Sequence, residues 1–155
     1  MALWQYSFFV LPKNTVLEIA PDLLFEKKDG LFDDAPYWKL GKIKRDVFNP
    51  ISKILPVANS WNKDLIIFGD NESNCFEVLV DGEYVESVSF RIDFRTGYER
   101  IIEELLFFFM SAEMLVLGED LNVLQLNGYE FKMKIENSPQ YKKYKNIANQ
   151  LSNEN

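Results

Sequence analysis

The chain has 155 residues, a net charge of −7, no histidine and a single cysteine, Cys75. Without histidine, neither a Ser-His-Asp triad nor a Cys-His pair can form, and a zinc site lacks its usual ligands. The negative charge disfavours nucleic acid and anionic membranes as partners. We therefore expect no catalytic residues, no metal and no cofactor, in a cytoplasmic protein whose lone thiol suits a reducing compartment.

Length and composition indicate one domain over residues 1–155, because 47% hydrophobic and 15% aromatic residues suffice for a core. Alternating aromatic and aliphatic side chains predict a first strand over 3–11. Residues 13–48 hold short apolar pieces broken by proline and glycine, and this pattern leaves their structure and role open. Asn49-Pro50 predicts the start of a short helix that ends before Pro56.

A three-stranded antiparallel meander is predicted over residues 64–95. The continuous apolar run 65–68 and the alternating segments 75–80 and 84–95 are typical of strands. A polar turn over 70–74 separates the first two, and Asp81-Gly82 is a hairpin signal between the last two.

A helix over 97–112 follows, with Thr96 and Glu99 in the spacing of a capping box. Its last turn is apolar on every side, which predicts deep packing of that end. Further strands are expected at 114–117 and 129–135, where apolar side chains recur.

Ser138-Pro139 predicts the start of a last helix, whose apolar stripe is Tyr141, Tyr144, Ile147, Ala148 and Leu151. The fold class expected is therefore α+β. A single domain would hold an antiparallel sheet of five or six strands packed against one buried helix, with the C-terminal helix nearby.

Arg91, Asp93 and Arg95 should share one face of a strand, because side chains alternate along it. Such a row could bind a carboxylate or a phosphate, or pair with a partner protein. The competing interpretation is a sheet face whose charges pair internally, including with Glu77.

Other chemical candidates have plain structural interpretations. The adjacent acids Asp33-Asp34 and Glu103-Glu104 are expected to be solvated. Cys75 opens a strand and should serve packing rather than nucleophilic catalysis.

The three tryptophans are predicted to differ in exposure. Trp4 should lie in the core, and Trp61 should pack against the end of the sheet. Trp38, beside Tyr37 in an irregular stretch, is the best candidate for an exposed aromatic that a partner would bury.

The chain resembles a group of small bacterial proteins in Trp61, Phe68-Gly69-Asp70, the Asp-Gly hairpin and the segment 91–95. The resemblance covers roughly residues 55–112. Some members of that group are encoded beside polymorphic or contact-dependent toxins as their immunity proteins. The resemblance implies an acidic protein without an enzymatic site that binds a toxin domain tightly, and it carries over no individual binding residue.

The leading hypothesis is a non-enzymatic protein-binding domain, an immunity protein that neutralises a basic bacterial toxin domain by direct binding. The residues expected to bind the partner are the turn acids and two aromatics: Asp70, Glu72, Glu83, Glu86, Tyr37 and Trp38. The alternative is a small-molecule or anion-binding module that uses Arg91, Asp93 and Arg95. A carboxylate-based enzyme ranks last, and a homodimer stays open.

Overall fold

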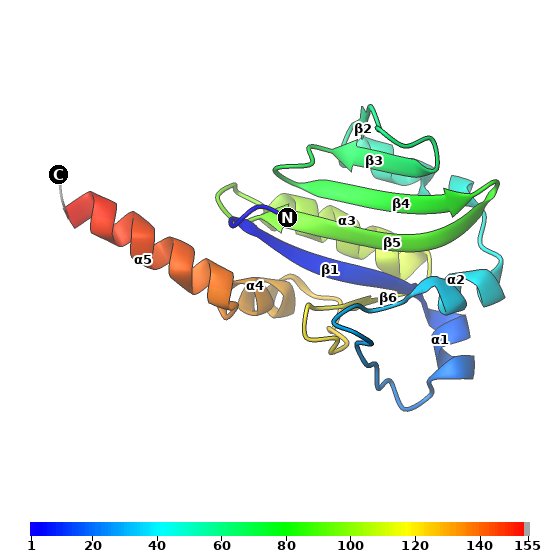
Figure 1. The fold of residues 1–155 in the computed structure, drawn as a ribbon. Coiled ribbons are helices and arrows are strands. Elements are labelled where there is room, and N and C mark those ends of the chain that lie inside the picture. Colours follow the sequence, from blue (N-terminus) through cyan, green and yellow to red (C-terminus); the bar gives the residue numbers. More distant parts are fainter. Residues whose placement is uncertain (154–155) are drawn as a thin grey trace.

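A computed structural model describes residues 1–153, in which helices pack on an antiparallel six-stranded sheet (Figure 1). The predicted α+β class is confirmed. The strands are β1 (Gln5–Pro12), β2 (Val57–Ala58), β3 (Leu65–Gly69), β4 (Cys75–Asp81), β5 (Tyr84–Asp93) and β6 (Met114–Leu117). The helices are α1 (Lys13–Ile19), α2 (Ala35–Gly41), the 3-10 helix η1 (Arg45–Lys53), α3 (Glu99–Ser111), α4 (Gly128–Glu136) and α5 (Pro139–Asn153).

The strand order is β2-β3-β4-β5-β1-β6. Strands β3, β4 and β5 form the predicted meander, joined by tight turns. Strand β1 comes first in the chain and lies between β5 and β6, pairing antiparallel with both. The pairings of β1 with β5 and β6 therefore join segments far apart in the sequence, and no local pattern specifies them.

One face of the sheet forms the main core against α3. Phe8, Phe76 and Phe90 lie side by side on adjacent strands, with ring centroids 4.7 Å and 5.8 Å apart for neighbouring pairs. Phe109 of α3 stacks on Phe90 at 5.5 Å. Each such fully buried aromatic contributes about 2–3 kcal/mol of hydrophobic stabilisation, which fixes α3 on this face.

Helix α2 lies beside β5, just beyond the point where the pairing of β5 with β1 ends. The last β1–β5 pair is Phe9 with Ser89, and just beyond it the Asp34 carboxylate accepts hydrogen bonds from the Ser87 hydroxyl and the Val88 amide. With its start tied to β5, α2 directs Trp38 into the core, 5.8 Å from the Phe48 ring. Neither α1 nor α2 was predicted, because both are short and lie in the segment broken by proline and glycine.

The opposite face of the sheet, the outer face, is covered only in part. At the β1–β6 end, a second apolar cluster of Leu11, Val16, Leu117 and Leu121 lies under α1 and the segment 20–34. Over β3, β4 and β5, Figure 1 shows no helix in front of the sheet in the part of the chain that is described. Half-buried side chains such as Leu79 and Ser89 line this open part.

The segment predicted as a strand at 129–135 is instead helix α4. Asn127 caps it, since its side-chain oxygen accepts from the amide of Glu130. Only Phe131 and Ile135, four residues apart, are buried, so the apolar alternation there was misleading. The predicted capping box is also wrong: α3 begins at Glu99, and the Thr96 hydroxyl donates to the backbone oxygen of Asp93.

The predicted C-terminal helix is confirmed as α5, which contacts the body through its first turns. Tyr141 and Tyr144 pack on Phe94, with ring centroids 5.3 Å and 5.4 Å away. Beyond these tyrosines the helix extends away from the sheet (Figure 1). No residue of α5 is fully buried within the range described.

Candidate functional site

A polar hollow lies on the open outer face, beside the β3–β4 turn, and we call it the outer-face hollow. It has a volume of about 460 Å³ and is lined by Met1, Ala2, Trp61, Leu65, Asn71, Glu72, Glu77 and Arg91. Strands β3, β4 and β5 supply its floor, and the loop before β3 supplies Trp61. Two residues predicted from separate motifs, Glu72 and Arg91, thus meet at one place.

Arg91 and Glu77 form an ion pair on the floor of the hollow. They are diagonal neighbours on β5 and β4, and an Arg91 terminal nitrogen lies 2.9 Å from a Glu77 carboxylate oxygen. The same nitrogen donates to the Asn71 side-chain oxygen at 2.8 Å. The Arg91 Nε is buried and has no hydrogen-bond partner among residues 1–153.

Asp93 and Arg95 form a second internal pair. Arg95 Nε and its terminal nitrogen donate to the two carboxylate oxygens at 3.0 Å and 2.9 Å. The Arg95 backbone amide and the Ser73 hydroxyl add two further bonds, each at 2.9 Å. Burial raises the pKa of Asp93, but these hydrogen bonds outweigh it, so the pKa is lowered overall. The Arg95 guanidinium also lies 4.0 Å from the centroid of Trp4, which is half-buried rather than in the core.

The four acidic residues predicted to bind a partner do not surround one site. Asp70 and Glu72 lie on the β3–β4 turn, whereas Glu83 and Glu86 lie at the β4–β5 turn, at the other end of β4. Seven residues of extended strand separate the two ends by about 20 Å. Glu86 is also 3.6 Å from Lys39, in an ion pair at the surface. Of these four residues, Glu72 alone lines the outer-face hollow.

The prediction that Trp38 is an exposed aromatic is wrong, since its exposed fraction is 0%. Its neighbour Tyr37 is half-buried and packs near Phe25 and Phe32 at ring distances of 5.9 Å and 6.5 Å. Trp61, expected to pack against the sheet, is instead 80% exposed. Its polar neighbours Asn59, Ser60, Asn62, Lys63 and Asp64 were the sequence signal that could have indicated this.

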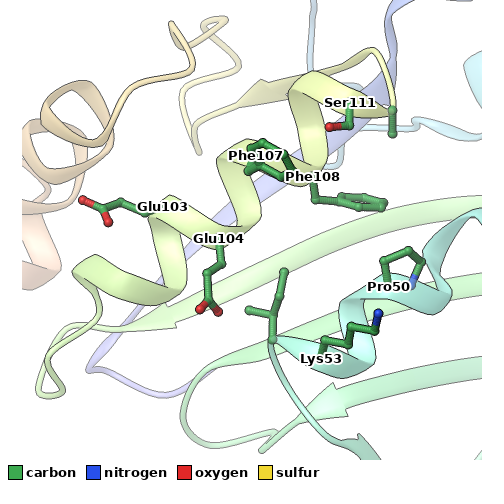
Figure 2. A pocket seen from close by; sticks show the side chains of 9 residues that line it. Pro50, Lys53, Glu103, Glu104, Phe107, Phe108 and Ser111 are labelled. Atoms are coloured by element: carbon green, nitrogen blue, oxygen red, sulfur yellow. The ribbon is translucent and has the colours of Figure 1, made fainter.

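A second, apolar groove runs between η1 and α3, on the side of the sheet opposite the outer-face hollow, and we call it the α3–η1 groove (Figure 2). It has a volume of about 620 Å³ and is lined by Pro50, Lys53, Ile54, Glu103, Glu104, Phe107, Phe108, Ser111 and Ala112. In Figure 2, Phe108 and Glu104 of α3 point toward η1. The predicted deep packing of this end of α3 is wrong in part, because Phe107 is 72% and Met110 54% exposed.

Two side chains with reactive groups, Cys75 and Asp34, are buried. Cys75 is buried, which raises the pKa of its thiol to about 12, despite the opposing effect of Arg91. Asp34 is buried, contrary to expectation, while Asp33 is exposed. Burial also raises the Asp34 pKa, against the hydrogen bonds from Ser87 and Val88. Residues 1–153 contain no group of three acidic or cysteine side chains placed to hold a metal ion.

A comparison with known protein families, curated proteins and solved structures finds no match to this chain. Among the helices described, none has the length and apolar character needed to cross a membrane.

Proposed function

We propose that this chain is a non-enzymatic protein-binding domain that acts as an immunity protein and neutralises a bacterial toxin domain by direct binding. The observation that carries the proposal is the exposed Trp61 at the edge of the outer-face hollow, beside the acidic β3–β4 turn. Tryptophan is one of the residues enriched in protein-binding hot spots, where a partner buries it within a ring of weaker contacts. The sequence resemblance over residues 55–112 supports the same class.

The charges around Trp61 favour a basic partner. Asp70 and Glu72 lie exposed on the turn, and the whole chain carries −7. Arg91, whose basic side chain lines the hollow, is already paired with Glu77. Trp61 would supply buried apolar contact, and the acidic turn would attract the basic surface of the toxin.

The proposed site of action is the cytoplasm, where an immunity protein meets a toxin that has entered or been made in the cell. The single thiol is compatible with that compartment, since Cys75 is buried and needs no disulfide. Binding would inhibit by covering the toxin's active surface, so the protein needs no catalytic group of its own.

The direct test is binding to the toxin domain encoded by the neighbouring upstream gene. We expect a complex at micromolar concentration in low salt. Trp61→Ala should raise the Kd by about 30-fold or more, through faster dissociation, since hot-spot aromatics contribute at least about 2 kcal/mol. Tyr129→Ala is the matched control, because Tyr129 is 70% exposed on α4, away from the hollow.

Two outcomes would count against the proposal. If the wild-type protein forms no complex under these conditions, or if a metabolic operon surrounds the gene, the immunity function fails. If a complex forms but Trp61→Ala and Tyr129→Ala bind equally well, the interface lies elsewhere than the hollow.

A second candidate is a small-molecule or anion site in the same hollow. It is supported by the Arg91 Nε, which is buried and donates to no acceptor among the described residues. It is the weaker candidate, because Arg91 and Arg95 each pair with an internal carboxylate. Titration with inorganic phosphate, followed by amide chemical shifts near Asn71 and Arg91, tests it. Absence of saturable shifts, or the same shifts in Arg91→Gln, removes this candidate.

A further inference from the structure

The arginine of the outer-face hollow is largely occupied by its own neighbours. One Arg91 terminal nitrogen donates to Glu77 Oε1, to the Asn71 side-chain oxygen and, at 3.3 Å, to the Asn71 backbone oxygen. The Arg91 Nε is buried, so it offers no exposed donor to an anion. An anion in the hollow would also meet the carboxylates of Glu72 and Glu77, which line it. The charges of the hollow therefore favour a cation as its occupant.

Both carboxylates of the hollow have accepting capacity left. Within residues 1–153, the Arg91 nitrogen and the Cys75 thiol both donate to the same oxygen of Glu77, Oε1, and the second oxygen, Oε2, accepts no bond. The Glu72 carboxylate is exposed on the β3–β4 turn and forms no ion pair within that range. A carboxylate has about four acceptor positions, so each of these two can accept from a cation that enters the hollow.

Trp61 gives the hollow a flat apolar wall beside these carboxylates. Its side chain is 80% exposed, on the loop before β3, and lines the same hollow. A guanidinium group can pack on an indole ring and still donate, in its own plane, to a carboxylate. A lysine ammonium has no such plane. The combination of an exposed indole and two carboxylates therefore favours arginine over lysine.

The chain holds one of its own arginines in this way beside the hollow. The Arg95 guanidinium lies 4.0 Å from the Trp4 ring centroid and donates to both carboxylate oxygens of Asp93. The Trp4 indole N–H donates to the Glu72 backbone oxygen at 2.7 Å, so this pair adjoins the turn that borders the hollow. The hollow offers the same two kinds of group, and no cation of residues 1–153 stacks on Trp61.

We propose that the outer-face hollow receives an arginine side chain of the partner, stacked on Trp61 and donating to Glu72 and to Glu77 Oε2. The inference rests on the proposed function, because the partner is the toxin domain, and it names the group that the toxin presents. The hollow, of about 460 Å³, lies within the range of roughly 300–1,000 Å³ typical of ligand sites. Arg91 holds Glu77 in place from the other side, so one carboxylate joins two guanidinium groups.

The test uses N-acetyl-L-arginine amide as the probe, titrated into the full chain without toxin. We expect saturable shifts of the Asn71 and Glu72 amide NMR signals, with a Kd of roughly millimolar order for a single side chain. N-acetyl-L-citrulline amide has nearly the same shape but a neutral head group, and it should bind about tenfold more weakly or not at all. Inorganic phosphate should give no saturable shifts at these amides.

Variants then locate the probe in the hollow. Trp61→Ala and Glu72→Gln should each raise the Kd for the arginine amide by about threefold or more, because they remove the stacking surface and one charged acceptor. Glu18→Gln is the matched control, since it removes the same charge from an exposed residue of α1 that does not line the hollow. Circular dichroism confirms that each variant is folded.

Three results would each overturn the proposal. They are no saturable shift with the arginine amide up to about 50 mM, equal binding of the citrulline amide, and equal effects of Glu72→Gln and Glu18→Gln. Saturation by phosphate instead of the arginine amide would make the hollow an anion site. A chain that binds the arginine amide but no toxin domain keeps this site and loses the proposed function. A chain that binds the toxin but not the arginine amide keeps the function and loses this site.

Discussion

Gly69 ends β3 in a conformation that only glycine adopts readily, with φ of +85°. A Cβ there would lie 2.2 Å from the backbone oxygen of Asn74, so the β3–β4 turn would have to move. We expect Gly69→Ala to lower the free energy of unfolding by at least about 3 kcal/mol, since the left-handed conformation and the steric overlap both cost energy. Urea denaturation at equilibrium measures it.

The matched control is Gly82→Ala in the other turn of the meander. Gly82 also has a positive φ, of +61°, but a Cβ there meets no atom within 4 Å. It should therefore cost only about 1 kcal/mol, the conformational part alone. Equal losses in the two variants would show that the contact with Asn74 does not constrain the turn.

Asp34 makes stability depend on pH in the direction opposite to most carboxylates. Burial raises its pKa in the folded protein, so the folded state holds the proton more tightly than the unfolded state. By linkage, its contribution to the free energy of unfolding grows as pH falls from neutral through the folded-state pKa. Relative to Asp34→Asn, the wild type should therefore gain stability on acidification.

Urea denaturation at neutral and mildly acidic pH tests this, as the difference between the wild type and Asp34→Asn at each pH. Asp33→Asn is the control, because it removes the same charge from an exposed neighbour. A difference between the wild type and Asp34→Asn that stays constant with pH would contradict the raised pKa.

The β3–β4 turn is held on the sheet by hydrogen bonds to two strands. Asp93 of β5 accepts from the Ser73 hydroxyl, and its amide donates to the Asn74 side chain at 2.8 Å. Gln5 of β1 donates to the backbone oxygens of Asn71 and Ser73. These bonds fix the turn that carries Asp70 and Glu72, so the element that borders the outer-face hollow is rigidly placed.

Asp93→Asn should lower the free energy of unfolding by about 2 kcal/mol at neutral pH, because it weakens hydrogen bonds between charged groups at a buried carboxylate. The lowered pKa means that the wild-type advantage is present above the unfolded-state pKa and is lost as pH falls through the folded-state value. Glu86→Gln, which removes a surface ion pair with Lys39, should cost less than about 0.5 kcal/mol. Similar costs for both, measured by urea denaturation, would contradict the structural role of Asp93.

At the scale of elements, local pattern predicted the meander, α3 and α5 well. The strands alternate cleanly, and Asp81-Gly82 marks their hairpin. Helices α1 and α2 escaped prediction because tertiary contacts, such as Asp34 on β5, stabilise such short helices rather than their own sequence. In 129–135 the alternation suggested a strand. The segment is a helix instead, because Asn127 caps it and Phe131 and Ile135 are buried at helical spacing.

For the whole molecule, the sequence indicated the kinds of side chain in the candidate site but not their grouping. Glu72 and Arg91 were both singled out, yet only the folded sheet brings them to one hollow. Exposure of the tryptophans was reversed, because Trp38 depends on how α2 is tied to β5, a long-range contact. The pairing of Arg91 with Glu77 was foreseen, since diagonal neighbours on adjacent strands interact.

The distribution of charge over the whole molecule gives the last prediction. Asp70→Lys with Glu72→Lys and Glu83→Lys with Glu86→Lys change the net charge equally, but at opposite ends of β4. If the toxin binds at the outer-face hollow, the first pair should slow association at low salt by about tenfold, and the second pair much less, because steering depends on charges near the contact. At about 0.5 M salt the Debye length is only a few Å, so both effects should largely vanish. Stopped-flow association rates with the toxin domain measure this, and a larger effect of Glu83→Lys with Glu86→Lys would move the interface to the β4–β5 turn.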